Sequence, residues 1–469
     1  DGLADLDHVE LFFRRNGIGT FNRFTDAANG NPEGKFTPQS GAAGTILFDS
    51  TRMGGDGVYE FYTVGVDAAG NREADPKDGT NAILPDQSAT FSAGQPVTVI
   101  STPTVIGEGD LTYDNLNLRI TAATVTVSGS HSFHNIELLN GAKLIHPETT
   151  LTTEYGVDFS AWTLSIDASS SIDASARGYL GGNHGGNACA GQTAPGISGS
   201  TERSGGSYGG TGAKTSGTPN LTYGSLVSPA ELGSGGSCGG GYGGGDGGGR
   251  VVIRAINIIS DGSIKANGQN GDGNDAGSGS GGAINLAVAT LSGEGTVEAN
   301  GGAYQLGGGG GRIAVNYVDI TTLDTALLKA LGGRGSAGAG GNGTVFLRGL
   351  SDTNGTLVVD GQGTATSFSP LPIAPGYVFD NIVLQNSARV VADDPLIVSD
   401  TFEIKSNSIL THSRGQEDGL QIQAAHVIVD STSSIDVLGK GYRGGLRDGR
   451  SVCPGETLGG LDGATERSG

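Results

Sequence analysis

The sequence predicts an all-β protein in which a small N-terminal β-sandwich is followed by a parallel β-helix with glycine-rich excursions. Three observations lead to this prediction. Apolar stretches with two-residue alternation recur along the chain, with no amphipathic helices between them. A phrase of about 30 residues repeats in the middle of the chain, inside a larger duplicated unit. Glycine supplies 87 of the 469 residues, against a usual share of roughly 7 %.

Residues 1–80 are predicted to form the sandwich, because short apolar stretches alternate there with turns. The most informative stretch is GDGVYEFYTVGVDAAGNRE (55–73), in which residues 67–71 form a hairpin tip and supply the Gly and Asn that positive φ angles favour. This stretch resembles the closing hairpin of bacterial immunoglobulin-like and fibronectin III-like domains. The resemblance implies that Tyr59 takes the place of their tyrosine corner. Residues 81–110 are predicted to be a linker that leads into the β-helix.

The remaining chain carries a duplicated unit, residues 111–350, and the start of a second copy at 351–469. Corresponding stretches lie 263 to 266 positions apart, and they occur in the same order in both copies. We expect this chain to be a fragment of a longer protein. The matching pairs are YDNLNL (113–118) with FDNIVL (379–384), IELLNGAKLIH (136–146) with FEIKSNSILTH (402–412), SSIDASARGYLGG (170–182) with SSIDVLGKGYRGG (433–445), Cys189 with Cys453, and TERSG (201–205) with TERSG (465–469).

A shorter repeat runs inside the unit. Gly249, Gly282 and Gly311 mark equivalent points of one phrase, which consists of an apolar strand, a turn, a second short strand and then glycine. Repeats of this length that contain strands and no helices predict a parallel β-helix, in which coils above and below pair both edges of each strand. Residues 321–331, TTLDTALLKAL, are the one helix-like exception.

The glycine-rich stretches, such as 233–250, are predicted to leave this wall of strands as loops. Ordering them as isolated coil would cost about 1–2 kcal/mol per residue without any side-chain burial in return. Packed as polyglycine II strands with three residues per turn, their amides can bond to neighbouring strands on every side. We therefore predict ordered glycine layers beside the β-helix, and the alternative is an unstructured, solvated loop.

Two cysteines, Cys189 and Cys238, stand at the two ends of one Gly/Ser-rich insertion. A disulfide between them would close a loop of about 50 residues and remove ~4 kcal/mol of unfolded-state entropy. A metal site is the less favoured alternative, because the sequence has no CxxC motif or histidine cluster nearby. Paired cysteines favour an extracytoplasmic setting.

The formal net charge of −21 argues against nucleic acid or an anionic membrane as a partner. Loops rich in Asp and Asn, such as 271–277, leave Ca²⁺ as a weak alternative, since their spacing fits no known calcium loop. No other cofactor and no metal ligand is predicted. No apolar run is long enough to insert into a membrane.

β-Helical folds also host polysaccharide lyases and hydrolases, whose sites need clustered carboxylates with basic residues. The carboxylate pairs Asp167 with Asp173 and Asp430 with Asp436 recur in both copies. Recurrence favours a structural role, so we expect Asp173 and Asp436 to accept backbone N–H bonds where strands bend. No catalytic residue is predicted.

The phrases SIDASARGYLGG, GGSYGG, GGGYGGGDGGGRVVI and GGGGGRIAV resemble those of large, glycine-rich extracellular repeat proteins of bacteria, which combine such repeats with immunoglobulin-like domains. The resemblance implies a non-enzymatic surface fibre, stalk or adhesin, located at the cell surface or outside the cell. Its implied partners are other copies of the same unit, in fibres or in tandem, and surface glycans. The alternative is a carbohydrate-active β-helix enzyme, a lyase or hydrolase, with an accessory domain. Repetition of one coil favours the rod, because an enzyme needs one irregular site.

Overall fold

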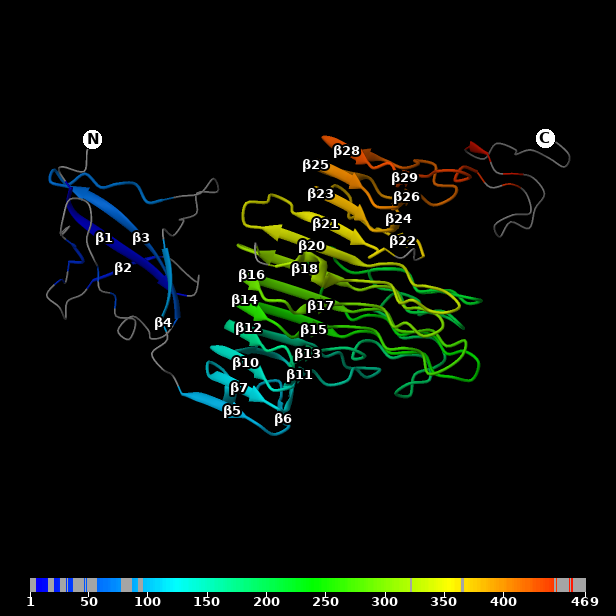
Figure 1. Cartoon of the computed structure of the whole chain (residues 1–469), viewed down its shortest axis with the longest axis horizontal. Helices are drawn as coiled ribbons and strands as arrows, with labels where there is room; N and C mark the ends of the chain where they lie inside the picture. The colour runs from blue at the N-terminus through cyan, green and yellow to red at the C-terminus, as the bar shows by residue number, and fades with distance from the viewer. Residues whose placement is uncertain are drawn as a thin grey trace. The chain divides into compact units, whose positions relative to one another are not determined.

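The structure of the chain is a computed structural model. The chain divides into two compact units, residues 1–96 and 97–469 (Figure 1). Cys453 and the second TERSG motif lie outside the described residues. The residues that the structure describes are 6–15, 21–25, 31, 33–36, 46, 48, 57–76, 87–91, 96–320, 323–363, 367–442, 444, 455 and 457–458.

Strands account for nearly all regular structure in both units. Among the described residues, the helical elements are two 3₁₀ turns, Leu111–Tyr113 and Thr325–Leu327. The prediction of an all-β protein with parallel strands is therefore confirmed. The helix-like pattern at 321–331 does not form an α-helix among the described residues. A single 3₁₀ turn, capped by the Asp324 side chain, leads directly into strand β19 (Leu328–Lys329).

The first unit contains an antiparallel sheet with the order β2-β1-β3-β4. Successive side chains of β3 point to opposite faces of the sheet. Val58, Tyr62, Val64 and Val66 are buried on one face, and Tyr59 is fully buried on the other. After β3 the chain turns at Asp67, whose carboxylate accepts the amides of Ala69 and Asn71 at 2.9 and 2.7 Å. The described residues of this unit form one sheet, and the second layer of a sandwich stays a prediction. The strands are β1 (Leu6–Arg15), β2 (Asn22–Arg23), β3 (Gly57–Asp67) and β4 (Gln87–Phe91).

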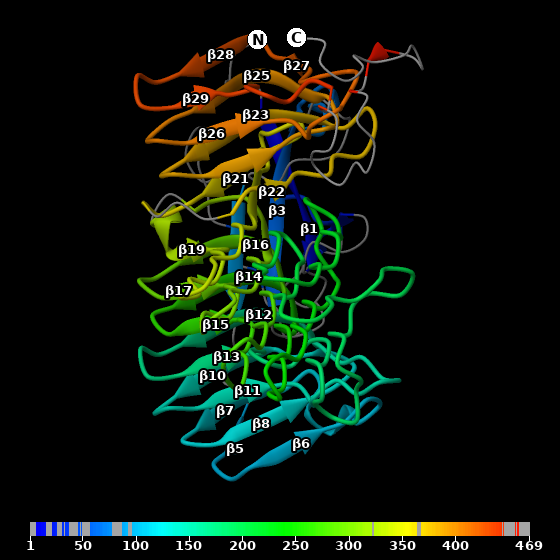
Figure 2. The ribbon, with the colours of Figure 1, turned by 90° about the vertical axis from the view of Figure 1, so that its right-hand side faces the viewer.

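In the second unit the chain alternates between two parallel sheets. Along the chain, strands of a long sheet are followed by short strands of a second sheet. Figure 2 shows successive strands stacked one above another. The long sheet contains β5 (Val97–Ile100), β7 (Asn117–Thr121), β10 (Asn135–Leu139), β12 (Val157–Ile166), β14 (Arg250–Ser260), β16 (Ala283–Ser292), β18 (Arg312–Tyr317) and β20 (Thr344–Gly349), with β9 (Ser130–Ser132) beside β12. The second sheet contains β6 (Thr104–Ile106), β8 (Thr124–Val127), β11 (Lys143–Ile145), β13 (Ser171–Asp173), β15 (Ser263–Lys265), β17 (Thr296–Glu298) and β19.

Aliphatic columns fill the space between these two sheets. Pairing in register places Leu118, Ile136, Leu164, Ile258 and Leu291 above one another, and each is at most 2 % exposed. A matching column runs up the second sheet from Val125 to Leu328. Burial of each such side chain contributes about 1.5–3 kcal/mol, so the two-residue alternation of every strand serves one continuous core.

The long sheet reverses direction once, between β20 and β21 (Thr356–Asp360), which pair antiparallel. The buried face changes at the same place. Val345 belongs to the first core, whereas its neighbour Phe346 packs with Leu357 in a second core. Strand direction and buried face therefore both reverse at this junction.

Beyond this junction the long sheet continues, and a third sheet replaces the second. The added strands of the long sheet are β23 (Val378–Gln385), β25 (Leu396–Ile404), β27 (Ile422–Gln423) and β28 (His426–Val429). The third sheet contains β22 (Ser369–Pro370), β24 (Arg389–Val391), β26 (Ile409–Thr411) and β29 (Ser434–Ile435).

Candidate functional site

The glycine-rich stretches are loops that connect the second sheet back to the long sheet. The largest runs from the end of β13 to the start of β14, and shorter ones follow β15, β17 and β19. Because these loops leave the stack at equivalent points of successive coils, they lie beside one another, on the right of the stack in Figure 1. We call the bonded parts of these loops, residues 178–249, 266–282, 299–311 and 330–343, the glycine layer.

Hydrogen bonding in the glycine layer follows a period of three residues, which residues 277–282 illustrate. The first and fourth amides of this segment donate to carbonyls in 234–237, the second and fifth to carbonyls in 306–309, and the third and sixth to carbonyls in 266–269. All six N···O distances are 2.7–2.9 Å. Each segment is therefore bonded to three neighbours in three directions, whereas a β-strand bonds to two neighbours in one plane.

At many of its glycines, the spacing between segments leaves no room for a side chain. At Gly279, Gly308 and Gly340, an added Cβ would lie under 3.0 Å from a backbone carbonyl of the neighbouring segment, that of Asp246, Gly279 and Gly308 respectively. These three glycines are buried. The layer is thus a core assembled mainly from backbone groups. This packing explains why a glycine run directly precedes a core strand such as β14.

The predicted disulfide between Cys189 and Cys238 is present, with the two Cα atoms 4.9 Å apart. The Cys238 amide also donates to the Cys189 carbonyl at 2.8 Å. The bond spans 49 positions and joins two residues inside the largest glycine loop, one toward its start and one toward its end.

A group of tyrosines and one arginine lies between the glycine layer and the long sheet. The Arg312 side chain is fully buried. Its Nε donates to the Tyr223 carbonyl at 2.9 Å, and its Nη1 donates to the Thr344 hydroxyl at 3.1 Å. The guanidinium also lies 5.5 Å from the centre of the Tyr208 ring. Burial lowers the pKa of Arg312 and raises that of Tyr208. The sequence patterns did not predict this group. Its only trace in the sequence is an arginine that directly follows a glycine run.

The recurring aspartates accept backbone amides at turns. Asp173 accepts the Ser175 amide at 3.0 Å, and Asp436 accepts the Leu438 amide at 2.9 Å. Asp167 accepts the amide of Asn140 at 2.6 Å, and this contact ties one coil to the previous one. In the second copy, Asp430 makes the same contact with the Ser406 amide at 2.6 Å.

Asp173 also lines a hollow of about 250 Å³ together with Thr124, Lys143, Ile145, Ser175 and Arg177. It is the one carboxylate in that lining. Among the described residues, no group of three or more His, Cys, Asp and Glu side chains is placed to hold a metal ion. The hollow thus lacks the pair of carboxylates that glycoside hydrolysis uses.

Tyr59 lies in β3 of the first unit, where its ring packs against Phe13, Phe48 and Phe61 with centroids 4.9–6.2 Å apart. The structure therefore places Tyr59 in the aromatic core of that unit, far in sequence from Cys189, Cys238, Asp173 and Asp436.

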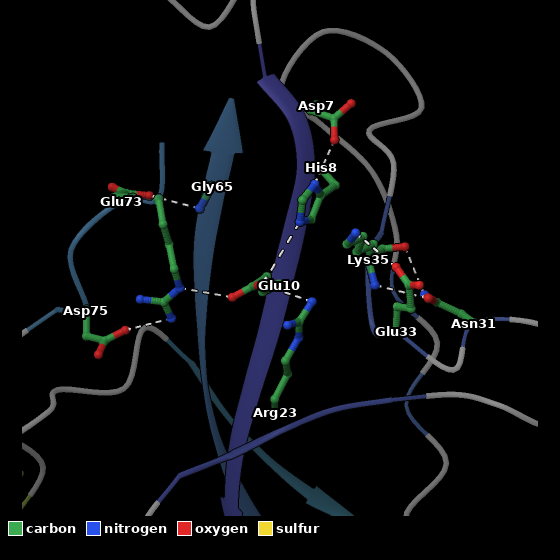
Figure 3. Close-up of polar contacts among 11 residues, drawn as sticks. Asp7, His8, Glu10, Arg23, Asn31, Glu33, Lys35, Gly65, Glu73 and Asp75 are labelled. Carbon is green, nitrogen blue, oxygen red and sulfur yellow. Dashed lines mark hydrogen bonds and ion pairs between the residues drawn. The ribbon is translucent and has the colours of Figure 1, made fainter. Parts of the chain in front are cut away.

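The first unit also holds a polar cluster around Glu10 (Figure 3). The Glu10 carboxylate is largely buried and pairs with Arg23 at 2.8 Å and with Arg72 at 3.0 Å. His8 Nδ1 lies 2.8 Å from an Asp7 carboxylate oxygen, and Glu73 accepts the Gly65 amide at 3.2 Å. These contacts join β1, β2 and the segment after β3, so the cluster stabilises this sheet.

His184 bridges two glycine loops. Its Nδ1 lies 3.0 Å from Asp246 Oδ1, and its Nε2 lies 2.8 Å from Asp272 Oδ2. Burial by itself lowers the pKa of His184, but the two carboxylates outweigh burial and raise the pKa above its ordinary value. A protonated His184 donates to both carboxylates and holds neighbouring loops of the glycine layer together.

A second histidine, His146, is fully buried beside Gly249. Its Nδ1 donates to the Pro147 carbonyl at 2.8 Å. Burial lowers the pKa of His146 to about 4 from an ordinary value of 6.5. As the pH falls, this imidazole is therefore protonated at a higher pH in the unfolded chain than in the folded protein.

The stability contributed by neutral His146 is therefore complete above pH 6.5 and is lost as the pH falls toward 4, a loss of about 3 kcal/mol in total. Between pH 6.5 and pH 4, we expect the unfolding free energy of the His146→Gln variant to fall by about 3 kcal/mol less than that of the original protein. Urea unfolding at a series of pH values measures the difference. Equal slopes for both proteins would contradict the assignment.

Comparison with known proteins finds no family model, no curated protein and no solved structure that matches this chain. No helix among the described residues has the length and apolar character needed to cross a membrane.

Proposed function

We propose that the second unit is a parallel β-helix solenoid whose loops pack as polyglycine II strands, and that the first unit is an immunoglobulin-like sandwich. The period of three in the glycine layer supports the first part, because polyglycine II and polyproline II share three residues per turn and have no internal hydrogen bonds. The alternation of the chain between parallel sheets supports the solenoid. The antiparallel pairing of β1, β3 and β4 supports the sandwich.

On this basis we propose that the protein is structural: a stiff rod, stalk or filament at the cell surface or outside the cell. The observation that carries this proposal is the glycine layer, which is held together mainly by backbone hydrogen bonds between its segments. The Cys189–Cys238 disulfide supports an oxidising location. Tandem copies of the unit and surface glycans are the partners that we propose.

Immunogold labelling of intact cells and of shed material, with antibodies against this chain, tests the proposal. We expect label on filaments of uniform width at the cell surface. Reducing-sugar assays of the purified chain on a panel of acidic polysaccharides provide the second arm. Release of reducing ends, together with label that is diffuse or intracellular, would contradict a structural role and favour the enzyme.

A further inference from the structure

The last coil that the structure describes leaves apolar side chains uncovered. Val427 and Val429 of β28 are 50 % and 41 % exposed, and Ile435 of β29 is 39 % exposed. They belong to the inward-facing columns of the stack, because Val427 and Val429 pair with buried Phe402 and Ile404, and Ile435 pairs with buried Leu410. Core positions are therefore open at this end.

The duplicated unit provides an internal reference for these positions. In the first copy the same positions, 263 residues earlier, are Leu164, Ile166 and Ile172, and each is at most 1 % exposed. The strand pairing before them is the same in both copies, since Leu164 pairs with Ile136 as Val427 pairs with Phe402. The two copies differ in the strands that cover these positions.

In the first copy, β14 and β15 cover these side chains. Ile258 of β14 is the register partner of Leu164, and Ile264 of β15 is the partner of Ile172. Both covering residues are fully buried. In the second copy, β28 pairs with β25 and β29 with β26, and no further strand among the described residues pairs with either one.

The opposite end of the stack is different. Ile100 of β5 and Ile106 of β6, which face inward in the first coil, are already buried at 5 % and 1 % exposure. The exposed valines there, Val97, Val99 and Val105, occupy the outward positions of these strands. This end therefore offers no uncovered core to match the end formed by β28 and β29.

We propose that the edge formed by β28 and β29 binds a parallel strand–turn–strand coil of the β14–β15 pattern, supplied by a further repeat unit. This partner fits because it already covers the same positions in the first copy. The proposal rests on the solenoid part of the proposed function and adds the identity of the partner. An open apolar edge of this kind is otherwise a site for uncontrolled strand pairing.

An extended chain tests this directly. The TERSG motif at 465–469 repeats 201–205, so residues 206–317 can be joined after Gly469 without breaking the repeat. Amide hydrogen exchange in β28 and β29 is then compared between the original and the extended chain. We expect exchange there to slow by about 100-fold or more, because covered strands open only with the larger cooperative unit.

The matched control carries Ile258→Asp and Ile264→Asp in the appended segment only, and we expect it to give no slowing. Three results would overturn the proposal: no slowing with the extended chain, equal slowing with the control, or slowing in the original chain at high concentration, which would assign the edge to a second copy. Exchange in β14 and β16 of the same samples reports whether the solenoid itself is formed. Failure of the partner assignment is thereby distinguishable from failure of the proposed function.

Discussion

Replacing Gly308 with alanine is expected to lower the free energy of unfolding by about 3 kcal/mol, with a larger loss if the glycine layer separates locally. The added methyl group would lie under 3.0 Å from the Gly279 carbonyl, and the backbones of Gly279 and Gly308 are both held by hydrogen bonds to other segments. A flexible side chain in the place of this carbonyl could move aside. The Gly279 carbonyl cannot, because its movement would break hydrogen bonds between neighbouring segments. Denaturant unfolding of the two proteins measures the loss.

Gly107→Ala is the matched control. No atom lies within 4 Å of the Cβ position there, and its φ is in the ordinary range. Alanine at such a site restricts the unfolded chain, so we expect stability to be unchanged or to rise by about 0.4–1 kcal/mol. A Gly308→Ala protein as stable as the control would show that the layer tolerates side chains and is not close-packed.

Removal of the disulfide is expected to have an effect of similar size. The double variant Cys189→Ala, Cys238→Ala should lose about 4 kcal/mol, because the bond closes a loop of 49 positions that has few apolar side chains to hold it. The loss should appear first in the glycine loops and only later in β12, β14 and β16. Exchange measurements resolve the two regions.

Cys453→Ala keeps this disulfide and serves as the control. We expect its unfolding curve to overlay that of the original chain. An unchanged unfolding free energy in the double variant would mean that the glycine loop is held by its backbone bonds alone.

Much of the fold could be predicted from periodicity. Two-residue alternation in stretches such as 250–260 indicated strands, and the regular spacing of Gly249, Gly282 and Gly311 indicated that equivalent strands recur at regular intervals. The cysteine pair was found because both residues stand at the ends of one insertion. These signals work because a repeated coil imposes the same physical demand at each step.

Other features left no such signal. The reversal between β20 and β21 was not predicted, because Val345 and Phe346 are both apolar and serve two different cores. Arg312 has the sequence context of a solvated charge, and its burial depends on Tyr208 and Tyr223, which lie about 90 to 100 positions away along the chain. Three residues per turn were predicted for the glycine-rich stretches, but the sequence does not show which segments bond to one another, because glycines carry no side chains that mark a register.

The glycine layer itself is tested most directly by native-state hydrogen exchange of its own amides. Buried amides of 277–282 and 307–311 donate to backbone carbonyls of neighbouring segments, so we predict that they exchange as slowly as amides in β14 and β16. Exchange at the rate of an unprotected chain, while the strands stay protected, would mean that these residues are solvated loops. In that case backbone bonding among glycines would not be what this protein is built on.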